Sequence, residues 1–392
     1  MSVQAAAQEV QETQTQQVAD VTIPQLVIEK NILLKALGHV QSVVEKRHTI
    51  PVLSNVKLDV TGQTLGLTAT DMEISVSEVV SAQVMQEGSL TVPAHMLFEI
   101  VKKLPDGAEI VFGEDDKQQG RISLVSGKSK FSLPFLPASD FPLIQSGNLP
   151  CSFTMDAKDL RILLEKTRFA SSTEETRYYL NGVFIGAEDD KLISAATDGH
   201  RMAKFAVTLP KGANKIPGII IPRKTVFEIG KLVEDFEEQI NVSVSDTKIQ
   251  IISGKVTLLS KLIDGVFPDY RNVLPERTEH IMEVNVSEFT HAVDRVATVS
   301  SEKTRAIKCL AADNSLTLSA ANEQSGSGKE VIEVIYDSIQ IDHVYNSRYL
   351  LEILAHIEDD TARVMFTGQD GPVMVFDDAY PDAVYVIMSM RM

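Results

Sequence analysis

The residue pair in this sequence that could support acid–base chemistry is Asp198 and His200, within the segment ATDGHRM. A carboxylate that orients an imidazole is the arrangement expected of a general base. Neither a serine nor a cysteine nucleophile can be assigned beside this pair. The related segment TATDMEI has Asp71 at the same place and no histidine. We therefore expect the aspartate to belong to a structural turn and take no part in catalysis.

Two other patterns could hold a ligand. The segment SGKS at 126–129 has the end of a phosphate-binding loop, but the first glycine of such a loop would fall at Ile122. Cys151 and Cys309 stand apart, with no CxxC pair and no histidine at metal-ligand spacing. The sequence therefore predicts reduced, mostly buried thiols, no metal site, no nucleotide site and no cofactor.

An internal repeat of about 125 residues organises the chain. One marker is LGLTATDMEIS, which recurs as LISAATDGHRM and, more weakly, as LTLSAANEQSG with Asn322. A second is VPAHMLFEIVKKL, which recurs as IPRKTVFEIGKLV and VYNSRYLLEILAHI, and a third is SGKSKFSLPF, which returns as SGKVTLLSKL. The repeat predicts three similar domains. Their expected bounds are 23–149, 150–276 and 277–392, after a disordered extension at 1–22.

Each repeat has the same order of elements. A first amphipathic helix is expected at 30–46, 157–170 and 287–299. A second is expected at 93–104, 222–233 and 346–357, with Pro93 and Pro222 opening two of them. Short alternating segments such as VKLDV and GVFIGA predict strands between the helices. This order predicts an α+β fold in which two helices pack on antiparallel sheets in each domain.

The charge of the chain is distributed unevenly. The formal net charge is -17, which by itself argues against a nucleic-acid partner. The charges of the helical segments, counted over 30–47, 93–104, 157–168, 222–233, 287–305 and 346–357, nevertheless sum to about +8, so the strands, turns and tail are strongly acidic. Lysine and arginine are also good helix formers, and acids favour turns, so this contrast has an alternative explanation that needs no partner.

The last residues, YVIMSMRM, alternate in a way that predicts a strand carried to the end of the chain. Chain ends normally fray. An apolar stripe that ends on Met392 therefore predicts a docked tail that lines a groove, and methionine suits a groove with varied partners. The alternative is an ordinary terminal strand that completes a sheet.

Longer motifs carry a family resemblance. RYYLNG at 177–182, ATDGHRMA at 196–203, IPRK at 221–224, SKLIDGVFPDYRNVLP at 260–275 and the terminal YVIMSMRM occur in order. Together they resemble the bacterial DNA polymerase III beta sliding clamps, from about Leu26 to the last residue. The resemblance implies a ring-forming head-to-tail homodimer of three-domain protomers around duplex DNA, held without sequence preference. It implies a processivity subunit with no catalysis of its own.

The resemblance also implies roles for individual residues. A pocket for short peptide motifs of the replicative polymerase, the clamp loader, other polymerases and repair proteins would be formed by Leu180, Thr197, Gly199, His200, Arg201, Met202, Pro268, Val273, Asn346, Tyr349, Val386, Ile387, Met388, Met390, Arg391 and Met392. DNA would be contacted by Arg47, Arg177, Tyr178, Tyr179, Arg223 and Lys224. The dimer interface would contain Lys128, Lys130, Phe131, Leu133, Thr298 and Val299. The chain departs from the family pattern at Asn272, Thr304 and Ser389.

Alternatives stay open at this point. Phe131 could be a plain core residue, and Tyr178 and Tyr179 could be ordinary strand residues. An enzyme using Asp198 and His200, or a repeat scaffold that binds proteins and never DNA, are the competing functions. No apolar run reaches the roughly 18 residues of a membrane helix and no signal segment opens the chain, so we expect a cytoplasmic protein without a membrane partner.

Overall fold

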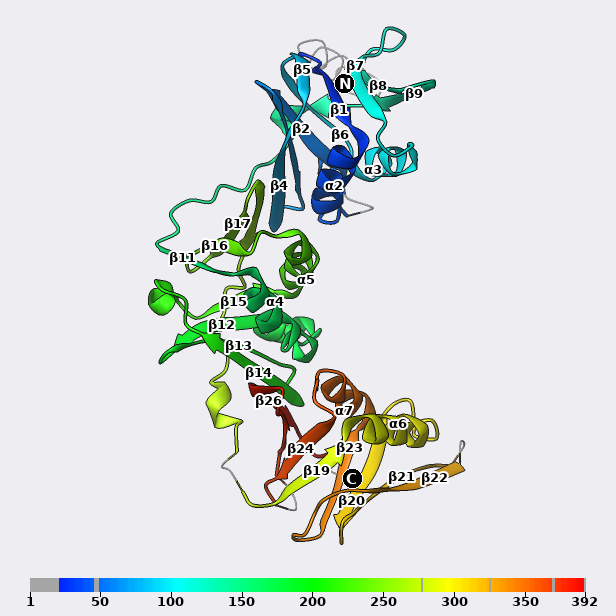
Figure 1. The fold of residues 1–392 in the computed structure, drawn as a ribbon, viewed down its shortest axis with the longest axis vertical. Coiled ribbons are helices and arrows are strands. Elements are labelled where there is room, and N and C mark those ends of the chain that lie inside the picture. The colour runs from blue at the N-terminus through cyan, green and yellow to red at the C-terminus, as the bar shows by residue number, and fades with distance from the viewer. Residues whose placement is uncertain (1–20, 46–48, 276–277, 324–325, 369–370, 391–392) are drawn as a thin grey trace, which may run out of the picture. The chain divides into compact units, whose positions relative to one another are not determined.

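The computed structural model describes residues 21–45, 49–275, 278–323, 326–368 and 371–390. The predicted extension at 1–22 therefore lies almost wholly outside the described residues. By their contacts the residues form two compact units, Met1–Ala157 with Phe227–Lys261, and Lys158–Val226 with Leu262–Met392. Each unit mixes helices with antiparallel sheets, as the α+β prediction requires (Figure 1).

The first unit contains a five-stranded sheet in the order β5-β1-β7-β8-β9 and a nine-stranded sheet in the order β10-β6-β2-β3-β4-β18-β17-β16-β11. The strands are β1 Gln25–Glu29, β2 Asn55–Thr61, β3 Thr64–Thr70, β4 Ile74–Ser81, β5 Gln83–Gln86, β6 Gly88–Pro93, β7 Glu109–Glu114, β8 Arg121–Ser126, β9 Ser129–Pro134, β10 Leu136–Pro137, β11 Cys151–Asp156, β16 Gln239–Val244, β17 Lys248–Ser253 and β18 Val256–Lys261. Helices α2 (Lys30–Gln41) and α3 (Ala94–Lys103) pack beside each other (Figure 1).

The second unit contains an eight-stranded sheet in the order β15-β12-β13-β14-β26-β25-β24-β19 and a four-stranded sheet in the order β22-β21-β20-β23. The strands are β12 Gly182–Glu188, β13 Lys191–Thr197, β14 Arg201–Thr208, β15 Ile219–Pro222, β19 Ile281–Asn285, β20 Ala306–Ala312, β21 Ser315–Asn322, β22 Gly326–Glu333, β23 Ile341–Asn346, β24 Thr361–Phe366, β25 Val373–Asp377 and β26 Tyr380–Ile387. Helices α6 (Val286–Ala297) and α7 (Ser347–Leu354) pack together here (Figure 1).

Sheets run on from one repeat into the next. Strand β4 of the first repeat pairs with β18 of the second, and β14 of the second repeat pairs with β26 of the third. Because these strand pairs hold parts of the second repeat against its two neighbours, the boundary between the two compact units falls within the second repeat. The repeats are therefore joined by backbone hydrogen bonds as well as by side chains.

The predicted helices occur, but several are shorter than expected. The first ends at Gln41 instead of residue 46, and α4 spans Ala157–Glu165, with a separate turn η3 at Arg168–Ala170. Helix α5 spans Arg223–Leu232 and is followed by η6 at Val233–Asp235. Amphipathic spacing continues through such single turns of 3₁₀ helix, so periodicity alone overestimates the length of the α-helix.

Candidate functional site

A tight turn between β13 and β14 holds Asp198, Gly199 and His200. The Oδ1 atom of Asp198 accepts hydrogen bonds from the backbone N–H groups of His200 at 2.9 Å and Arg201 at 3.0 Å. The Thr197 hydroxyl donates to the Arg201 carbonyl at 2.7 Å and accepts from the Gly199 N–H at 3.1 Å. Gly199 has φ +87°, a conformation that glycine adopts at little steric cost. The turn leaves His200 exposed at its tip.

The first repeat builds the same turn with the same hydrogen bonds. The Oδ1 atom of Asp71 accepts from the N–H groups of Glu73 at 2.9 Å and Ile74 at 2.7 Å. The Thr70 hydroxyl donates to the Ile74 carbonyl at 2.7 Å and accepts from the Met72 N–H at 3.0 Å. Met72 has φ 76° where the second repeat has glycine. The prediction that Asp198 belongs to a shared structural turn is confirmed by this match.

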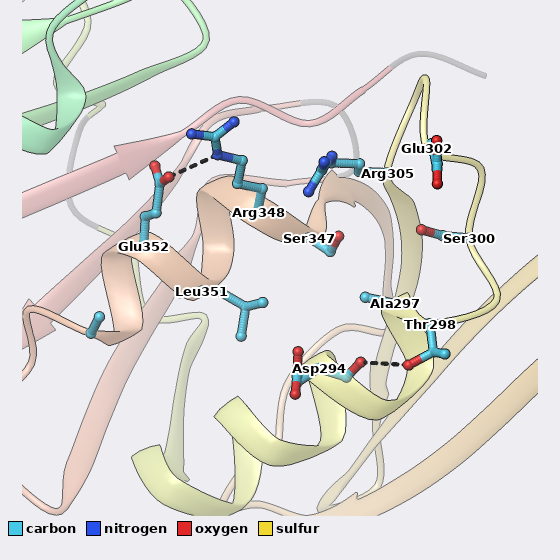
Figure 2. Close-up of a pocket in the computed structure, with 11 residues that line it drawn as sticks. Asp294, Ala297, Thr298, Ser300, Glu302, Arg305, Ser347, Arg348, Leu351 and Glu352 are labelled. Atoms are coloured by element: carbon cyan, nitrogen blue, oxygen red, sulfur yellow. Dashed lines mark hydrogen bonds and ion pairs between the residues drawn. The ribbon is translucent and has the colours of Figure 1, made fainter.

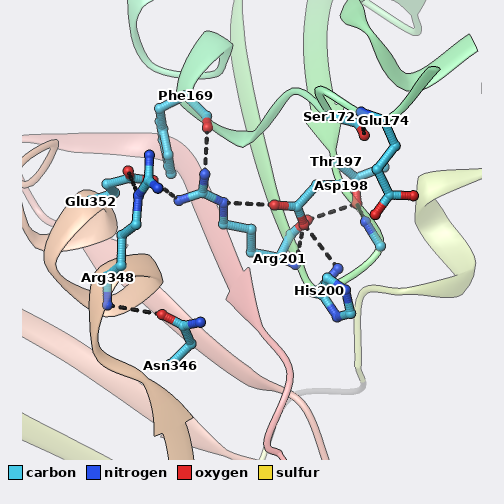
Figure 3. A network of polar contacts seen from close by, with 11 residues as sticks. Phe169, Ser172, Glu174, Thr197, Asp198, His200, Arg201, Asn346, Arg348 and Glu352 are labelled. Carbon is cyan, nitrogen blue, oxygen red and sulfur yellow. Dashed lines mark hydrogen bonds and ion pairs between the residues drawn. The ribbon is translucent and has the colours of Figure 1, made fainter. Parts of the chain in front are cut away.

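Arg201 ties this turn to the third repeat (Figure 3). Its Nε donates to Asp198 at 3.1 Å, its Nη2 to the Phe169 carbonyl at 2.7 Å, and its Nη1 to Glu352 on α7. The guanidinium carbon lies 4.4 Å from the centre of the Tyr349 ring. The side chain of Arg201 is only 7% exposed. Its buried charge is compensated by the two carboxylates, the Phe169 carbonyl and the Tyr349 ring. Arg201 therefore fixes the turn against α7.

Glu352 completes this cluster and was not identified from the sequence. It also accepts from Arg348 Nε at 2.9 Å. Burial opposes ionisation of this carboxyl, but the hydrogen bonds from Arg348 and Arg201 outweigh burial and lower the pKa of Glu352. A signal existed in the repeat, because Glu99 and Glu228 occupy the corresponding place in FEI segments of the first two repeats.

The C-terminal segment runs along this turn. Strand β26 pairs with β14, with Ile387 opposite Arg201 and Val386 opposite Met202. After the strand ends, the N–H of Met388 donates to the His200 carbonyl at 2.9 Å, and the N–H of Met390 donates to the Val344 carbonyl at 2.7 Å. The tail is thus held between the turn of the second repeat and strand β23 of the third.

The prediction of a strand carried to the chain end is wrong. Strand β26 stops at Ile387, and Tyr385, Val386 and Ile387 are all at most 1% exposed, so burial does not alternate there. Neighbours cover both faces of the strand, which removes the period of two. Met388 is 42% exposed, while Arg391 and Met392 lie outside the described residues.

The other expected pocket residues divide into a buried and an exposed set. The buried ones are Leu180, Met202 and Val386, and the last two belong to one core cluster with Tyr270. The more accessible ones are Thr197, Gly199, His200, Pro268, Val273, Asn346, Tyr349, Met388 and Met390. The rings of His200 and Tyr349 are nearly parallel with centroids 6.2 Å apart. The structure therefore brings the turn, α7 and the tail together around His200.

Comparison with known proteins identifies the family. Models of the N-terminal, central and C-terminal domains of the DNA polymerase III beta subunit match residues 24–145, 154–269 and 271–391. A beta sliding clamp of Caulobacter vibrioides is 43% identical, with 93% of this chain and 99% of that protein covered. The Escherichia coli clamp is 34% identical over the same shares. The chain belongs to the DNA polymerase III beta subunit family. It is a beta sliding clamp, the processivity factor of that polymerase.

Solved sliding clamps share its fold. A Caulobacter crescentus clamp has a TM-score of 0.89 at 43% identity, covering 94% of this chain and 100% of that one. A Bartonella birtlesii clamp, solved bound to griselimycin, has a TM-score of 0.91 at 39% identity, covering 95% and 100%. Among the described residues, no helix is long and apolar enough to cross a membrane.

The residues expected to contact DNA in this clamp occupy two places. Arg177, Tyr178 and Tyr179 lie in the 3₁₀ segment η4 (Glu175–Leu180), so the alternative that the tyrosines are strand residues is wrong. Tyr178 is 54% exposed, and its ring stands edge-on to Tyr179 at 5.8 Å. Arg223 and Lys224 open α5, and Arg47 lies outside the described residues.

The residues expected at the clamp's dimer interface lie near sheet edges. Strand β9 is an edge of the five-stranded sheet; Lys128 and Lys130 are exposed and Phe131 is half-buried. Leu133 is only 1% exposed, because it points into the core of its own domain, so it offers no surface to a partner. Thr298 and Val299 follow α6 next to β22, the edge of the four-stranded sheet.

A hollow of about 440 Å³ lies between α6 and α7 in the third repeat (Figure 2). It is lined by Asp294, Ala297, Thr298, Ser300, Glu302, Arg305, Ser347, Arg348, Leu351, Glu352 and Ala355. Arg348 and Glu352 also belong to the cluster around Arg201, whereas neither Asp198 nor His200 reaches this hollow. Its lining mixes acids and bases, so it has no strong preference for one charge.

Proposed function

We propose that this clamp closes as a head-to-tail homodimer around duplex DNA and slides along it while holding the replicative polymerase. The ordered match to all three domains of the family carries this proposal. A closed ring holds DNA by topology, so it needs only weak, sequence-independent attraction to phosphates. This reconciles a chain of net charge -17 with a DNA partner. The domain bounds 23–149, 150–276 and 277–392 are part of the same proposal.

Topological retention separates this function from a protein-binding scaffold. The clamp is loaded onto nicked circular DNA by a clamp loader with ATP, and retention is measured by gel filtration before and after the circle is linearised. We expect retention on the circle and release from the linear form. Equal retention on both would contradict the ring, and so would no retention on the circle. Affinity at low salt is not informative, because a ring need not bind tightly.

Partner proteins are proposed to dock by short peptides on the surface made by the turn at His200, α7 and the tail. Support comes from the accessible His200, Tyr349 and Met388 around a rigid base of buried Arg201. Relatives in this family have been solved bound to griselimycin. The departures Asn272 and Thr304 are exposed, and Ser389 lies within the tail itself, so they are suited to alter which peptide is preferred.

Deletion of Met388 to Met392 tests this docking surface. It removes the segment held by His200 and Val344 but leaves β26 paired, so the fold should persist. We expect binding of a labelled polymerase-tail peptide, measured by fluorescence anisotropy, to be lost while the mass of the dimer is unchanged. Unchanged peptide affinity would refute the role of the tail. An alanine substitution at exposed Leu143, far along the chain from these elements, serves as the control.

The protein is proposed to lack catalytic activity and to work in the cytoplasm. Both carboxylate oxygens of Asp198 are engaged, by backbone N–H groups and by Arg201. The same turn exists in the first repeat without a histidine. A hydrolytic activity that His200→Ala abolished would overturn this part of the proposal.

A further inference from the structure

A basic side chain occupies the same position of the repeat at each of the two joints between successive repeats. His39 lies in the last turn of α2, and Lys166 directly follows α4. The separation of these two residues along the chain equals that of Asp71 and Asp198, so they are equivalent in the repeat. Both are buried, at 7% and 3% exposed.

Both ring nitrogens of His39 lie within hydrogen-bond distance of a carboxylate oxygen. Its Nδ1 lies 2.6 Å from an oxygen of Glu78 on β4, and its Nε2 lies 3.1 Å from an oxygen of Asp235 in η6. A carboxylate only accepts hydrogen bonds, so both ring nitrogens must carry a proton. The ring is therefore an imidazolium. It joins an acid of the first repeat to an acid of the second.

Other polar contacts also cross this joint beside His39. Lys35 of α2 contacts the second carboxylate oxygen of Asp235 at 2.7 Å. On α5, Glu228 accepts from Ser42 of the first repeat and from Lys231 at 3.2 Å. From α3, His95 reaches the Val44 carbonyl and not the His39 ring. Loss of the Nδ1 proton would take this donor from buried Glu78, whereas loss of the Nε2 proton would leave Asp235, whose side chain is 44% exposed, paired with Lys35 alone.

Lys166 makes the corresponding connection between the second and third repeats. Its ammonium lies 2.9 Å from Glu358 and 3.6 Å from buried Asp377, and donates to the His356 carbonyl at 2.8 Å. It also sits 4.1 Å from the centre of the Tyr380 ring. The second joint thus has a lysine where the first joint has an imidazole, the side chain whose charge changes in the neutral range. The third-repeat counterpart, Arg295, pairs within its own domain with Glu330.

We propose that His39 is a pH-dependent latch that tightens the joint between the first and second repeats as an imidazolium and loosens it on deprotonation, whereas Lys166 keeps the next joint tight. Burial alone would lower the pKa of His39, but its hydrogen bonds with Glu78 and Asp235 outweigh burial and raise that pKa above 6.5. The latch therefore contributes fully below that ordinary value and is lost as pH rises through the raised one. This inference goes beyond DNA binding and does not depend on it.

The full-length protein allows both the titration and the joint to be followed. Histidine ring signals assign the midpoint of His39 by NMR, with exposed His291 as the internal reference. Spin labels at Gln118→Cys and Asp246→Cys report the first joint by pulsed EPR, and labels at Lys211→Cys and Asp337→Cys, both exposed, report the second. Labelled chains are diluted with unlabelled protein, and native Cys151 and Cys309 are buried.

We expect His39 to titrate above pH 6.5, and the distance distribution of the first joint to broaden with the same midpoint. The second joint should not change. His39→Lys should keep the first joint narrow throughout, as Lys166 does for its own joint, and His39→Gln should leave it broad throughout. His291→Gln, a matched exposed control, should behave as wild type.

Three results would overturn the latch: a His39 midpoint at or below pH 6.5, a first joint whose width does not follow the His39 titration, or a His39→Lys protein whose first joint broadens as in wild type. Circular dichroism at each pH establishes that every variant is folded. If His39→Lys fails to fold, the comparison of wild type with His39→Gln still decides, because equal widths at low pH would refute the latch.

Discussion

Single residues decide how the turn at the docking surface is built in each repeat. The first two repeats share the same pattern of side-chain hydrogen bonds, yet one places Met72 and the other Gly199 at the position with positive φ. A side chain in this conformation costs about 1–2 kcal/mol. In the second repeat a Cβ at this position would also lie 2.5 Å from a guanidinium nitrogen of Arg177, so the flexible end of that side chain would have to shift.

We expect Gly199→Ala to lower the free energy of unfolding by about 1–2 kcal/mol, because it introduces backbone strain and a contact with Arg177. Met72→Gly, in the equivalent turn, should change stability by less than about 1 kcal/mol, since strain relief is offset by greater freedom of the unfolded chain. Urea unfolding measures both. Equal losses in the two variants would contradict this account of the turn.

Protonation of the Glu352 carboxylate makes the stability of the protein depend on pH. Because its pKa is lowered from 4.5, it contributes stability above that value, and this contribution is lost as pH falls through the lowered pKa. We expect Glu352→Gln to be less stable than wild type at neutral pH and the difference to shrink in acid. Thermal melts between about pH 3 and pH 7 measure this. A difference independent of pH would mean that the charge of Glu352 is unimportant.

Helix α5 carries positive charges in its first turn, where the helix dipole disfavours them. Arg223 and Lys224 occupy its first turn, at the positive end of the helix dipole, with no acid there, whereas the first turn of α4 balances Lys158 with Asp159. Such a placement lowers helix stability by about 0.3–1 kcal/mol per charge. Contact with DNA phosphates is the role that we propose for these two residues.

The double variant Arg223→Gln with Lys224→Gln should therefore separate stability from binding. We expect the protein to be as stable as wild type or slightly more so, while the salt dependence of its affinity for DNA weakens by about one unit of slope per lost phosphate contact. Lys231→Gln, at the other end of α5, is the control. A variant with an unchanged salt slope would remove these residues from the DNA surface.

Periodicity predicted the existence and order of the helices, because each packs one apolar face on a sheet. It did not predict their ends, since 3₁₀ turns such as η3 and η6 continue the same spacing. Periodicity also mispredicted where the last strand ends, because β26 is covered on both faces and Tyr385 to Ile387 are buried in succession. The Asp198 turn was predictable from its first-repeat copy, whereas Glu352 needed knowledge of which helix faces Arg201.

For the whole molecule, dimerisation is proposed to join the β9 edge of one copy to the β22 edge of another. Edge strands present unpaired backbone groups, and pairing them extends both sheets. Phe131→Asp should place a charge in this joint and reduce the mass measured by light scattering to that of one chain, 43.1 kDa. Met85→Asp, on the opposite edge strand β5 of the same sheet, is the control. A dimeric Phe131→Asp protein would place the interface elsewhere.

The two edges differ from each other, since β9 carries Lys130 and Phe131 while β22 carries Lys329, Glu330 and exposed Val331. Head-to-tail association through two unlike edges does not limit the number of protomers by itself. The assembly closes into a ring only when the rotation between successive protomers brings the last edge to the first, and otherwise it grows into a filament. Stoichiometry is then set by geometry and not by affinity. A protomer damaged at one end still docks through its intact end, so in a mixed population it turns closed assemblies into open arcs and acts dominantly.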